Sequence, residues 1–466
     1  MFDELTNNAI AEISSSYRSE APINDKLIDN YILTLDFATI QQPSYFQSII
    51  PLVNQTLLDS AYPTIDPTGI LIKLLGKILS YLSFKQVLEY YPADFILENL
   101  FSSSASSIIC LKILTLNIHE SETKDFLSFN HVITKLLTVF FKETTPILVL
   151  NLIESLVSAI NSKEGHLLEE CTEILSLVRK LNNTILLARL LDLLLILTNK
   201  FNLDMKMYNF EREEIAKFMD DPLFLILLIQ FYVNLTGSDV NIDESIANVL
   251  ILFKKGEFDD IVDSEVAELI AAMSYHSYDS ILSNFEVFKS YNFIKIYEKD
   301  EVELKLLSKS NPEVVYTLNA SIYDDVLKHL PLLDHAYLPI LLNFIASPNI
   351  WTSLQTKLTN ERLESLSKDK LYQLLLAMSR YNHSKEYLFN NLPNIMSNEV
   401  IGSDIRNNDI WKIKLQILEN LKRSDDVPVP GAHFWETKIE GCYNLMKFGQ
   451  SYKHVQPKVE VIDDTM

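Results

Sequence analysis

The chain contains little glycine. Nine of its 466 residues are glycine, about 2% against the ~7% of an average protein. Nucleotide-binding and hydrolase folds need glycine where the backbone takes a positive φ or comes close to a phosphate. None of the motifs G-x-G-x-x-G, G-x-x-x-x-G-K-[ST] or G-x-S-x-G occurs. These absences argue against a dinucleotide-binding protein, a P-loop NTPase and an α/β-hydrolase.

Cysteine and basic residues are also scarce. Cys110, Cys171 and Cys442 lie far apart in apolar surroundings, so they form no disulfide framework and suit a reducing compartment. Lys and Arg number 40 against 62 Asp and Glu, which gives a formal net charge of −22 at pH 7. The longest basic clusters are pairs, such as Lys254 with Lys255. Because an acidic chain repels phosphate, direct binding to DNA or to anionic lipid is disfavoured.

No apolar run reaches the ~20 residues that a transmembrane helix needs. The most apolar stretches are 186–197, which Arg189 and Asp192 interrupt, and 222–235. The segment Met1–Arg18 carries three acidic side chains and lacks the basic and apolar regions of a signal peptide. We therefore expect a protein of the cytoplasm, or of the cytoplasm and the nucleus.

What the sequence has in abundance is helical periodicity. Apolar residues make up 48% of the chain, and in Asp66–Leu82 they recur at i, i+4 and i+8. Asp66 followed by Pro67 predicts a helix start, and Asp221-Pro222 and Asn311-Pro312 repeat the device. No alternating runs joined by Asn-Gly or Asp-Gly indicate strands. The chain is predicted to be all-α.

Helices of roughly 10 to 18 residues alternate with short polar breaks, which favours antiparallel neighbours. Pairs of ~40–47 residues are typical of armadillo and HEAT arrays. We predict a curved α-solenoid of about ten such pairs over residues 1–450, followed by a disordered tail at 451–466. The alternative is a compact multi-helix bundle. The solenoid is favoured because helices continue for nearly the whole chain without a segment of linker composition.

No residue pattern supports catalysis or metal binding. Nine histidines and three cysteines are spread along the chain without the short spacings of a zinc site. Acidic pairs such as Asp259-Asp260 fall where helices are expected to start, and capping accounts for them there. We therefore expect no catalytic residue, no metal ligand and no cofactor, and a protein that is not an enzyme.

Two asparagines occupy positions similar to those of groove residues in armadillo arrays. Asn343 lies in Leu338–Leu354, and Asn117 lies at a similar offset in Ile108–Ser121. In armadillo-type repeats, which these stretches resemble, an asparagine there projects into the groove. The alternative is that each asparagine lies at a helix end and bonds to its own backbone. Both interpretations stay open at this stage.

Two longer strings, Phe84–Leu100 (FKQVLEYYPADFILENL) and Arg380–Met396 (RYNHSKEYLFNNLPNIM), resemble strings in the HEAT/armadillo-repeat chaperones that assemble the base of the proteasome regulatory particle. The fungal member of that family was first named for a DNA mismatch-repair phenotype. The order of the predicted elements from about Leu57 to about Asn398 is also similar.

The resemblance implies a curved solenoid whose concave face grips the C-terminal domain of one Rpt-type AAA ATPase subunit, with contacts to its neighbour and to a base scaffold subunit. It further implies that such binding prevents premature docking on the core particle. Asn117, Asn343, Arg380, Tyr381 and Asn382 are predicted to rim the groove as partner contacts. The alternative for Tyr381 is partial burial between helix pairs.

Other functions fit a helical array as well. An armadillo-type co-chaperone that exchanges nucleotide on Hsp70 is the main alternative, although such proteins are usually shorter and more regular. A transport adaptor of the importin type would need regularly spaced tryptophan–asparagine pairs, which the three tryptophans do not supply. A repair factor that touches DNA is disfavoured by the negative charge.

Overall fold

The computed structural model is helical throughout the part that it describes. That part comprises residues 2–36, 43–102, 105–169, 171–198, 200, 203–276, 278–286, 288, 293–321, 324, 329–422 and 429–449. Every regular element in these ranges is a helix and none is a strand, which confirms the all-α prediction. None of the described helices is both long and apolar enough to cross a membrane. The predicted tail at 451–466 lies outside the described residues.

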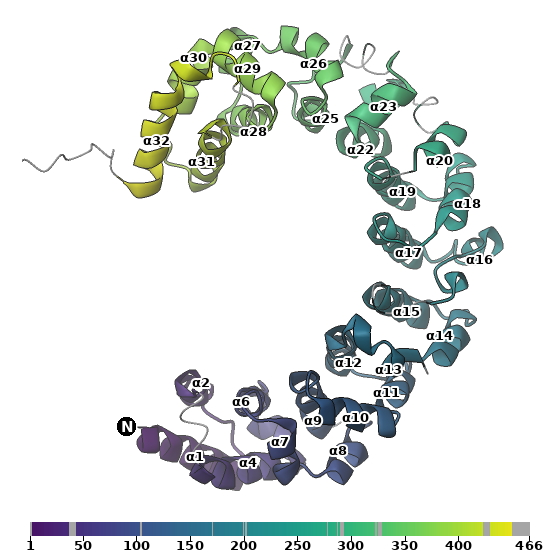
Figure 1. Ribbon diagram of the computed structural model, residues 1–466, viewed down its shortest axis with the longest axis vertical. Helices are drawn as coiled ribbons and strands as arrows, with labels where there is room; N and C mark the ends of the chain where they lie inside the picture. Colours follow the sequence, from purple (N-terminus) through teal and green to yellow (C-terminus); the bar gives the residue numbers. More distant parts are fainter. Residues whose placement is uncertain are drawn as a thin grey trace, which may run out of the picture. The chain divides into compact units, whose positions relative to one another are not determined.

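The chain divides into two compact units. Unit 1 contains residues 1–211 and 238–242, and unit 2 contains residues 212–237 and 243–466. In each unit the helices stack side by side in two layers, which we call layer A and layer B (Figure 1). This arrangement is consistent with an α-solenoid.

Layer A of unit 1 is a row in which each helix packs against the next. Its members are α2 (Asp25–Thr34), α6 (Ile70–Leu79), α9 (Ala105–Leu116), α12 (Ile147–Ala159) and α15 (Thr184–Leu197). Layer B covers one side of this row. It includes α1 (Phe2–Ser19), α4 (Pro43–Leu58), α7 (Phe84–Tyr90), α8 (Ala93–Asn99), α10 (Ser121–Phe129), α11 (Val132–Phe140), α13 (His166–Glu169) and α14 (Thr172–Arg179).

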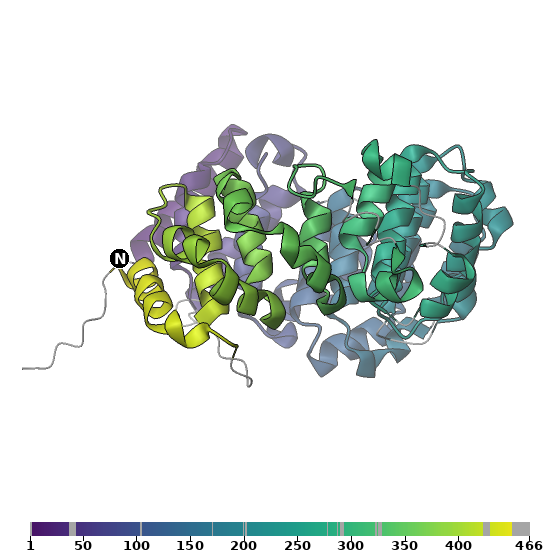
Figure 2. The ribbon, with the colours of Figure 1, turned by 90° about the horizontal axis from the view of Figure 1, so that it is seen from above.

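Unit 2 repeats the two-layer arrangement, and Figure 2 shows its green helices side by side. Layer A consists of α17 (Pro222–Leu235), α19 (Asp260–Met273), α22 (Glu301–Lys309), α25 (Leu338–Phe344), α28 (Lys368–Met378) and α31 (Asn408–Lys422), with α32 (Glu436–Phe448) against α31. Layer B includes α16 (Arg212–Ala216), α18 (Asp243–Lys254), α20 (Asp279–Asn284), α21 (Phe293–Tyr297), α23 (Pro312–Leu318), α26 (Pro348–Leu354), α27 (Asn360–Glu364), α29 (Asn382–Asn391) and α30 (Pro393–Ile395).

Two of the three predicted helix starts are confirmed, and the third is displaced. Asp221 and Asn311 are N-caps whose side chains accept from Phe224 N (3.1 Å) and Glu313 N (3.1 Å). The helix predicted to start at Asp66 begins only at Ile70, because Gly69 turns the backbone with φ +73°. Asp66 still caps it from outside: the buried carboxylate accepts from Ile70 N (2.8 Å) and Leu71 N (2.9 Å).

Side chains from one repeat also satisfy the C-terminal carbonyls of helices in the preceding repeat. The last carbonyl groups of a helix have no partner inside it. Arg189 donates to the carbonyls of Phe140 and Lys142 at the end of α11, both at 2.8 Å. Lys200 donates to those of Val157 (3.1 Å) and Ile160 (2.7 Å) at the end of α12. In unit 2, His383 Nε2 lies 2.8 Å from the carbonyl of Ile345, which follows α25.

The buried carboxylate of Asp66 gives a test of this local structure. Asp66→Ala leaves two buried amide donors without their acceptor, so we expect the free energy of unfolding to fall by about 1–3 kcal/mol. Chemical denaturation followed by circular dichroism measures the loss. Asp94→Ala, which removes an exposed acid from the first turn of α8, is the control and should change stability by less than about 0.5 kcal/mol. Equal effects of the two substitutions would contradict the capping role.

Candidate protein-binding surface

The layer-A helices expose the face that points away from layer B, and four of them share one register. The helices α12, α15, α17 and α19 begin at positions 147, 184, 222 and 260, so their starts recur at a nearly constant spacing. An apolar side chain near each start is exposed. In unit 1 these are Ile147 (74% exposed) and Ile185 (56%), and in unit 2 Leu223 (73%) and Ile261 (65%).

A polar side chain follows each apolar residue by seven positions: a carboxylate in three cases, and in the fourth the amide of Gln230, which donates to Glu265 (3.4 Å). Unit 1 places Glu154 after Ile147 and Asp192 after Ile185. Unit 2 places Gln230 after Leu223 and Glu268 after Ile261. Because residues i and i+7 share one face of a helix, the apolar side chain and the polar side chain point the same way. Each unit therefore carries a row of apolar groups and, two turns along, a row of polar groups.

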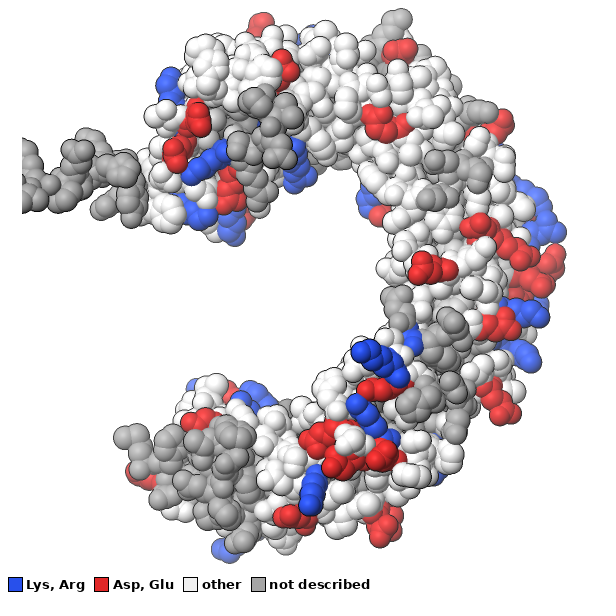
Figure 3. Space-filling model, in the orientation of Figure 1, with Lys and Arg blue, Asp and Glu red and all other residues white. Residues whose placement is uncertain are grey.

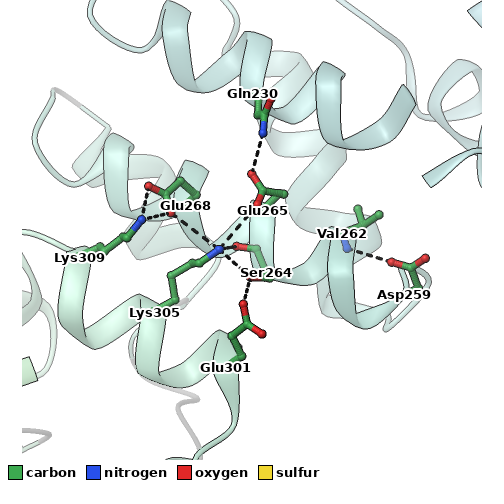
Figure 4. A network of polar contacts seen from close by, with 9 residues as sticks. All are labelled: Gln230, Asp259, Val262, Ser264, Glu265, Glu268, Glu301, Lys305 and Lys309. Carbon is green, nitrogen blue, oxygen red and sulfur yellow. Dashed lines mark hydrogen bonds and ion pairs between the residues drawn. The ribbon is translucent and has the colours of Figure 1, made fainter. Parts of the chain in front are cut away.

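In unit 2 the one acidic member of this row, Glu268, is neutralised by lysines of the next helix (Figure 4). Lys309 Nζ on α22 lies 2.7 and 2.6 Å from the two carboxylate oxygens of Glu268 on α19. Lys305 Nζ forms ion pairs with Glu265 (3.7 Å) and Glu268 (3.9 Å). It also donates to the carbonyl (3.1 Å) and hydroxyl (2.6 Å) oxygens of Ser264. These contacts join α19 to α22.

In unit 1 the corresponding carboxylates have no such partner. Neither Glu154 nor Asp192 makes a hydrogen bond or ion pair with any residue of the described chain. Partial desolvation raises the pKa of Asp192. Desolvation and then the negative charge of Asp192 raise the pKa of Glu154.

The two predicted asparagines are both engaged in the structure of their own chain. Asn117 is 4% exposed, and its amide donates to the carbonyl of Ile113, four residues earlier (2.9 Å). It thus has the contact expected of the helix-end alternative and presents almost no surface. Asn343 is half-buried and donates to the carbonyls of Leu307 (2.9 Å) and Ser310 (2.7 Å) in the preceding repeat. It caps the end of α22.

The other three predicted residues are consecutive: Arg380 and Tyr381 lie between α28 and α29, and Asn382 is the first residue of α29. Arg380 and Asn382 are exposed, whereas Tyr381 is half-buried. The ring of Tyr381 stacks on that of His383, with centroids 5.9 Å apart and an interplanar angle of 11°. Tyr275, at the end of α19, is 56% exposed, and desolvation and the charge of Tyr381 raise its pKa. The C-terminal ends of layer A in unit 2 thus present an exposed cation beside aromatic rings, and partner contact there stays a prediction.

The register of the four helices was missed by sequence reasoning. The distance in sequence between successive helices varies along the chain, so the regular spacing of α12, α15, α17 and α19 is not obvious. A signal was present: Ile147, Ile185, Leu223 and Ile261 recur at one constant spacing, and each is followed seven positions later by Glu, Asp, Gln or Glu.

No group of three His, Cys, Asp or Glu residues in the described ranges could hold a metal ion.

The capping role of Asn343 can be measured. Asn343→Ala removes the donor to two carbonyls at the end of α22, and we expect the free energy of unfolding to fall by about 1–3 kcal/mol. Urea denaturation followed by tryptophan fluorescence reports the change. Asn382→Ala removes an exposed amide and is the matched control, with an expected change below about 0.5 kcal/mol. If Asn343→Ala were equally mild, the amide would not be a structural cap.

Comparison with known proteins matches the whole chain to one family. The family model described as "DNA mismatch repair protein HSM3, N terminal domain" matches residues 7–237, and that of the C terminal domain matches 240–466. A relative from Candida albicans named DNA mismatch repair protein HSM3 is 46% identical over 475 residues and is covered fully, as is this chain. Proteins of that name from Scheffersomyces stipitis (38% identical, 100% of this chain and 98% of the relative) and Saccharomyces cerevisiae (22%, 70% of each) also match. The chain belongs to the HSM3 family.

Proposed function

We propose that this chain is a chaperone for assembly of the base of the proteasome regulatory particle. It binds the C-terminal domain of one Rpt-type AAA ATPase subunit and prevents premature docking of that subunit on the core particle. A neighbouring ATPase and a base scaffold subunit are further partners. The observation that carries the proposal is that the chain belongs to the HSM3 family along its entire length. The link to proteasome assembly comes from the strings at 84–100 and 380–396, which resemble strings in the assembly chaperones.

The two-layer stack supports this role in physical terms. If the stacks form a curved solenoid of about ten helix pairs, the exposed face of layer A lines a groove that seats a folded domain. Repeat proteins of this kind bind through an extended surface, with little rearrangement. In unit 2 that surface runs from the exposed apolar groups of α17 and α19 to the rim at Arg380 and Tyr381.

We propose that the protein acts by binding its partners, without an enzymatic activity or a cofactor. We place it in the cytoplasm, or in the cytoplasm and the nucleus. Its net charge of −22 favours a partner with a basic surface, because complementary charge raises the rate of encounter. Direct contact with DNA is not part of the proposal, although the relatives bear a mismatch-repair name. On the face in Figure 3, described Lys and Arg side chains appear in small groups among acidic ones rather than as a large basic area.

The proposal is tested by titrating the purified chain with the isolated C-terminal domain of each proteasomal ATPase. We expect one domain to bind and a DNA duplex not to bind. The double variant Arg380→Glu, Tyr381→Ala should weaken that binding about tenfold or more, because charge reversal and loss of an aromatic contact act together. Isothermal titration calorimetry measures both affinities.

Arg362→Glu is the matched control, since Arg362 is an exposed arginine on α27 in layer B. It should leave the affinity unchanged. Failure of every ATPase domain to bind would reject the proposed function. Binding that is insensitive to the Arg380–Tyr381 variant would reject only that rim as the contact.

A further inference from the structure

The helix α32 of unit 2 has an exposed face that is apolar. Its inner side packs on α31 and on the π-helical turn Met396–Ile401, and it buries Ile439 and Tyr443 (Figure 1). The other side carries Leu445 (54% exposed) and Phe448 (59% exposed). Because an α-helix turns once in 3.6 residues, these two side chains point away from the side that packs on α31.

A glycine extends this face toward the start of the helix. Gly441 precedes Leu445 by four residues, so both lie on one side of α32. Gly441 is exposed, and a Cβ built there would meet no described atom within 4 Å. We call Gly441, Leu445 and Phe448 the outer face of α32. A terminal helix of a stack normally turns a polar face to water, so an apolar face here indicates that something covers it.

One cation beside the outer face has no acidic partner among the described residues. Lys438 is exposed, and its Nζ lies 5.3 Å from the centroid of the Trp435 ring. Two other lysines close to α32, Lys422 and Lys447, each form an ion pair with a glutamate (3.2 and 3.3 Å). An occupant of the outer face would therefore gain from an acidic group placed near Lys438.

The sequence that follows α32 contains a stretch of matching chemistry. Residues 459–464 read VEVIDD, and we call them the VEVIDD segment. Its first and third residues are Val459 and Val461. In an extended chain these two share one face and lie ~7 Å apart. Residues i and i+4 of a helix lie ~6 Å apart along its axis, so the two valines match the spacing of Leu445 and Gly441.

The connection to α32 allows this segment to return to the helix. Gly449 ends α32 in the left-handed region (φ +72°), and its amide donates to the carbonyl of Leu445 (3.0 Å). Such a residue turns the chain away from the direction of the helix. Residues 450–458 can span up to ~30 Å, whereas a helix of 13 residues is ~20 Å long. The VEVIDD segment can therefore reach any part of the outer face.

We propose that the VEVIDD segment binds the outer face of α32 in extended form, antiparallel to the helix. Val459 packs on Leu445. Val461 covers Gly441, and the two aspartates lie beside Lys438. Burial of apolar surface holds the valines, and the aspartates supply the acid that Lys438 lacks. The proposal replaces, for these residues, the disorder that composition predicts. It concerns contacts within one chain and does not depend on the proposed ATPase site.

Hydroxyl-radical footprinting of the full chain tests this placement, with mass spectrometry to measure how fast Leu445 and Phe448 are oxidised. We expect both to react at least about threefold more slowly in the unaltered chain than in the double variant Val459→Asp, Val461→Asp, because a tethered segment binds at a high effective concentration. Phe129 of α10 is 83% exposed and should react at the same rate in both proteins.

The controls separate the register and the charge contact. The double variant Val455→Asp, Gln456→Asp adds two acids just before the VEVIDD segment and should leave the protection of the outer face unchanged. Lys438→Glu should speed the oxidation of Leu445, whereas Lys412→Glu, at an exposed lysine of α31, should not. Equal effects of the two lysine variants would contradict the contact between Lys438 and the aspartates. Equal thermal midpoints check that all variants keep the fold.

Two results would overturn the proposal. One is equal reactivity of the outer face in the unaltered chain and in the Val459–Val461 variant, whether fast or slow. The other is protection that disappears on tenfold dilution, which would assign the face to a second copy of the chain. The ATPase titration distinguishes this proposal from the proposed function, because the Val459–Val461 variant should bind the ATPase domain with unchanged affinity.

Discussion

The stacks depend on hydrogen bonds that side chains of one repeat donate to the helix ends of the repeat before it. The helices are short (α25 has 7 residues and α19 has 14 residues), so they are at best marginally stable alone in water. Each also leaves carbonyl groups at its C-terminus without a partner. Arg189 and Lys200 satisfy such carbonyls in unit 1, and Asn343 and His383 do so in unit 2. Each bond joins residues 33 to 49 positions apart in sequence. Each repeat therefore stabilises the helices of the repeat before it.

This mode of stabilisation leaves one face of layer A available for binding. The buried sides of α17 and α19 carry apolar or small residues, whereas their exposed sides begin with Leu223 and Ile261 and include the polar groups Gln230 and Glu268. Capping occurs at helix ends, whereas on the exposed face Gln230 of α17 donates to Glu265 of α19 (3.4 Å) and lysines of α22 reach Glu268. Where such contacts form, as with Lys305 and Lys309, the face contributes to stability.

The fold class could be predicted from sequence because it depends on local patterns. Apolar periodicity gave the helices, and the Asp-Pro and Asn-Pro pairs at residues 221 and 311 gave two starts, since a cap and its amide lie three residues apart or fewer. The start near Asp66 was three residues off, because Gly69 adopts a positive φ that the Asp-Pro pattern does not reveal. For Asn117 and Asn343 the sequence left two roles open: the amide of Asn117 reaches a carbonyl four residues earlier, whereas that of Asn343 reaches a carbonyl 33 residues away, which depends on how distant segments pack.

The candidate surfaces were harder to predict, because whether a carboxylate is paired with a cation depends on residues that lie far from it in the sequence. Glu154, Asp192 and Glu268 look alike in sequence, since each follows an exposed isoleucine by seven residues. Only the structure shows that Lys309 reaches Glu268, and that Arg189 and Lys200 reach backbone carbonyls instead of the other two acids. Arg189 and Lys200 stabilise helix ends in unit 1, whereas Lys309 neutralises Glu268 in unit 2, so repeats of one register differ in the charge that they expose. A helical repeat can therefore keep its core and change its binding properties by redirecting a single lysine or arginine.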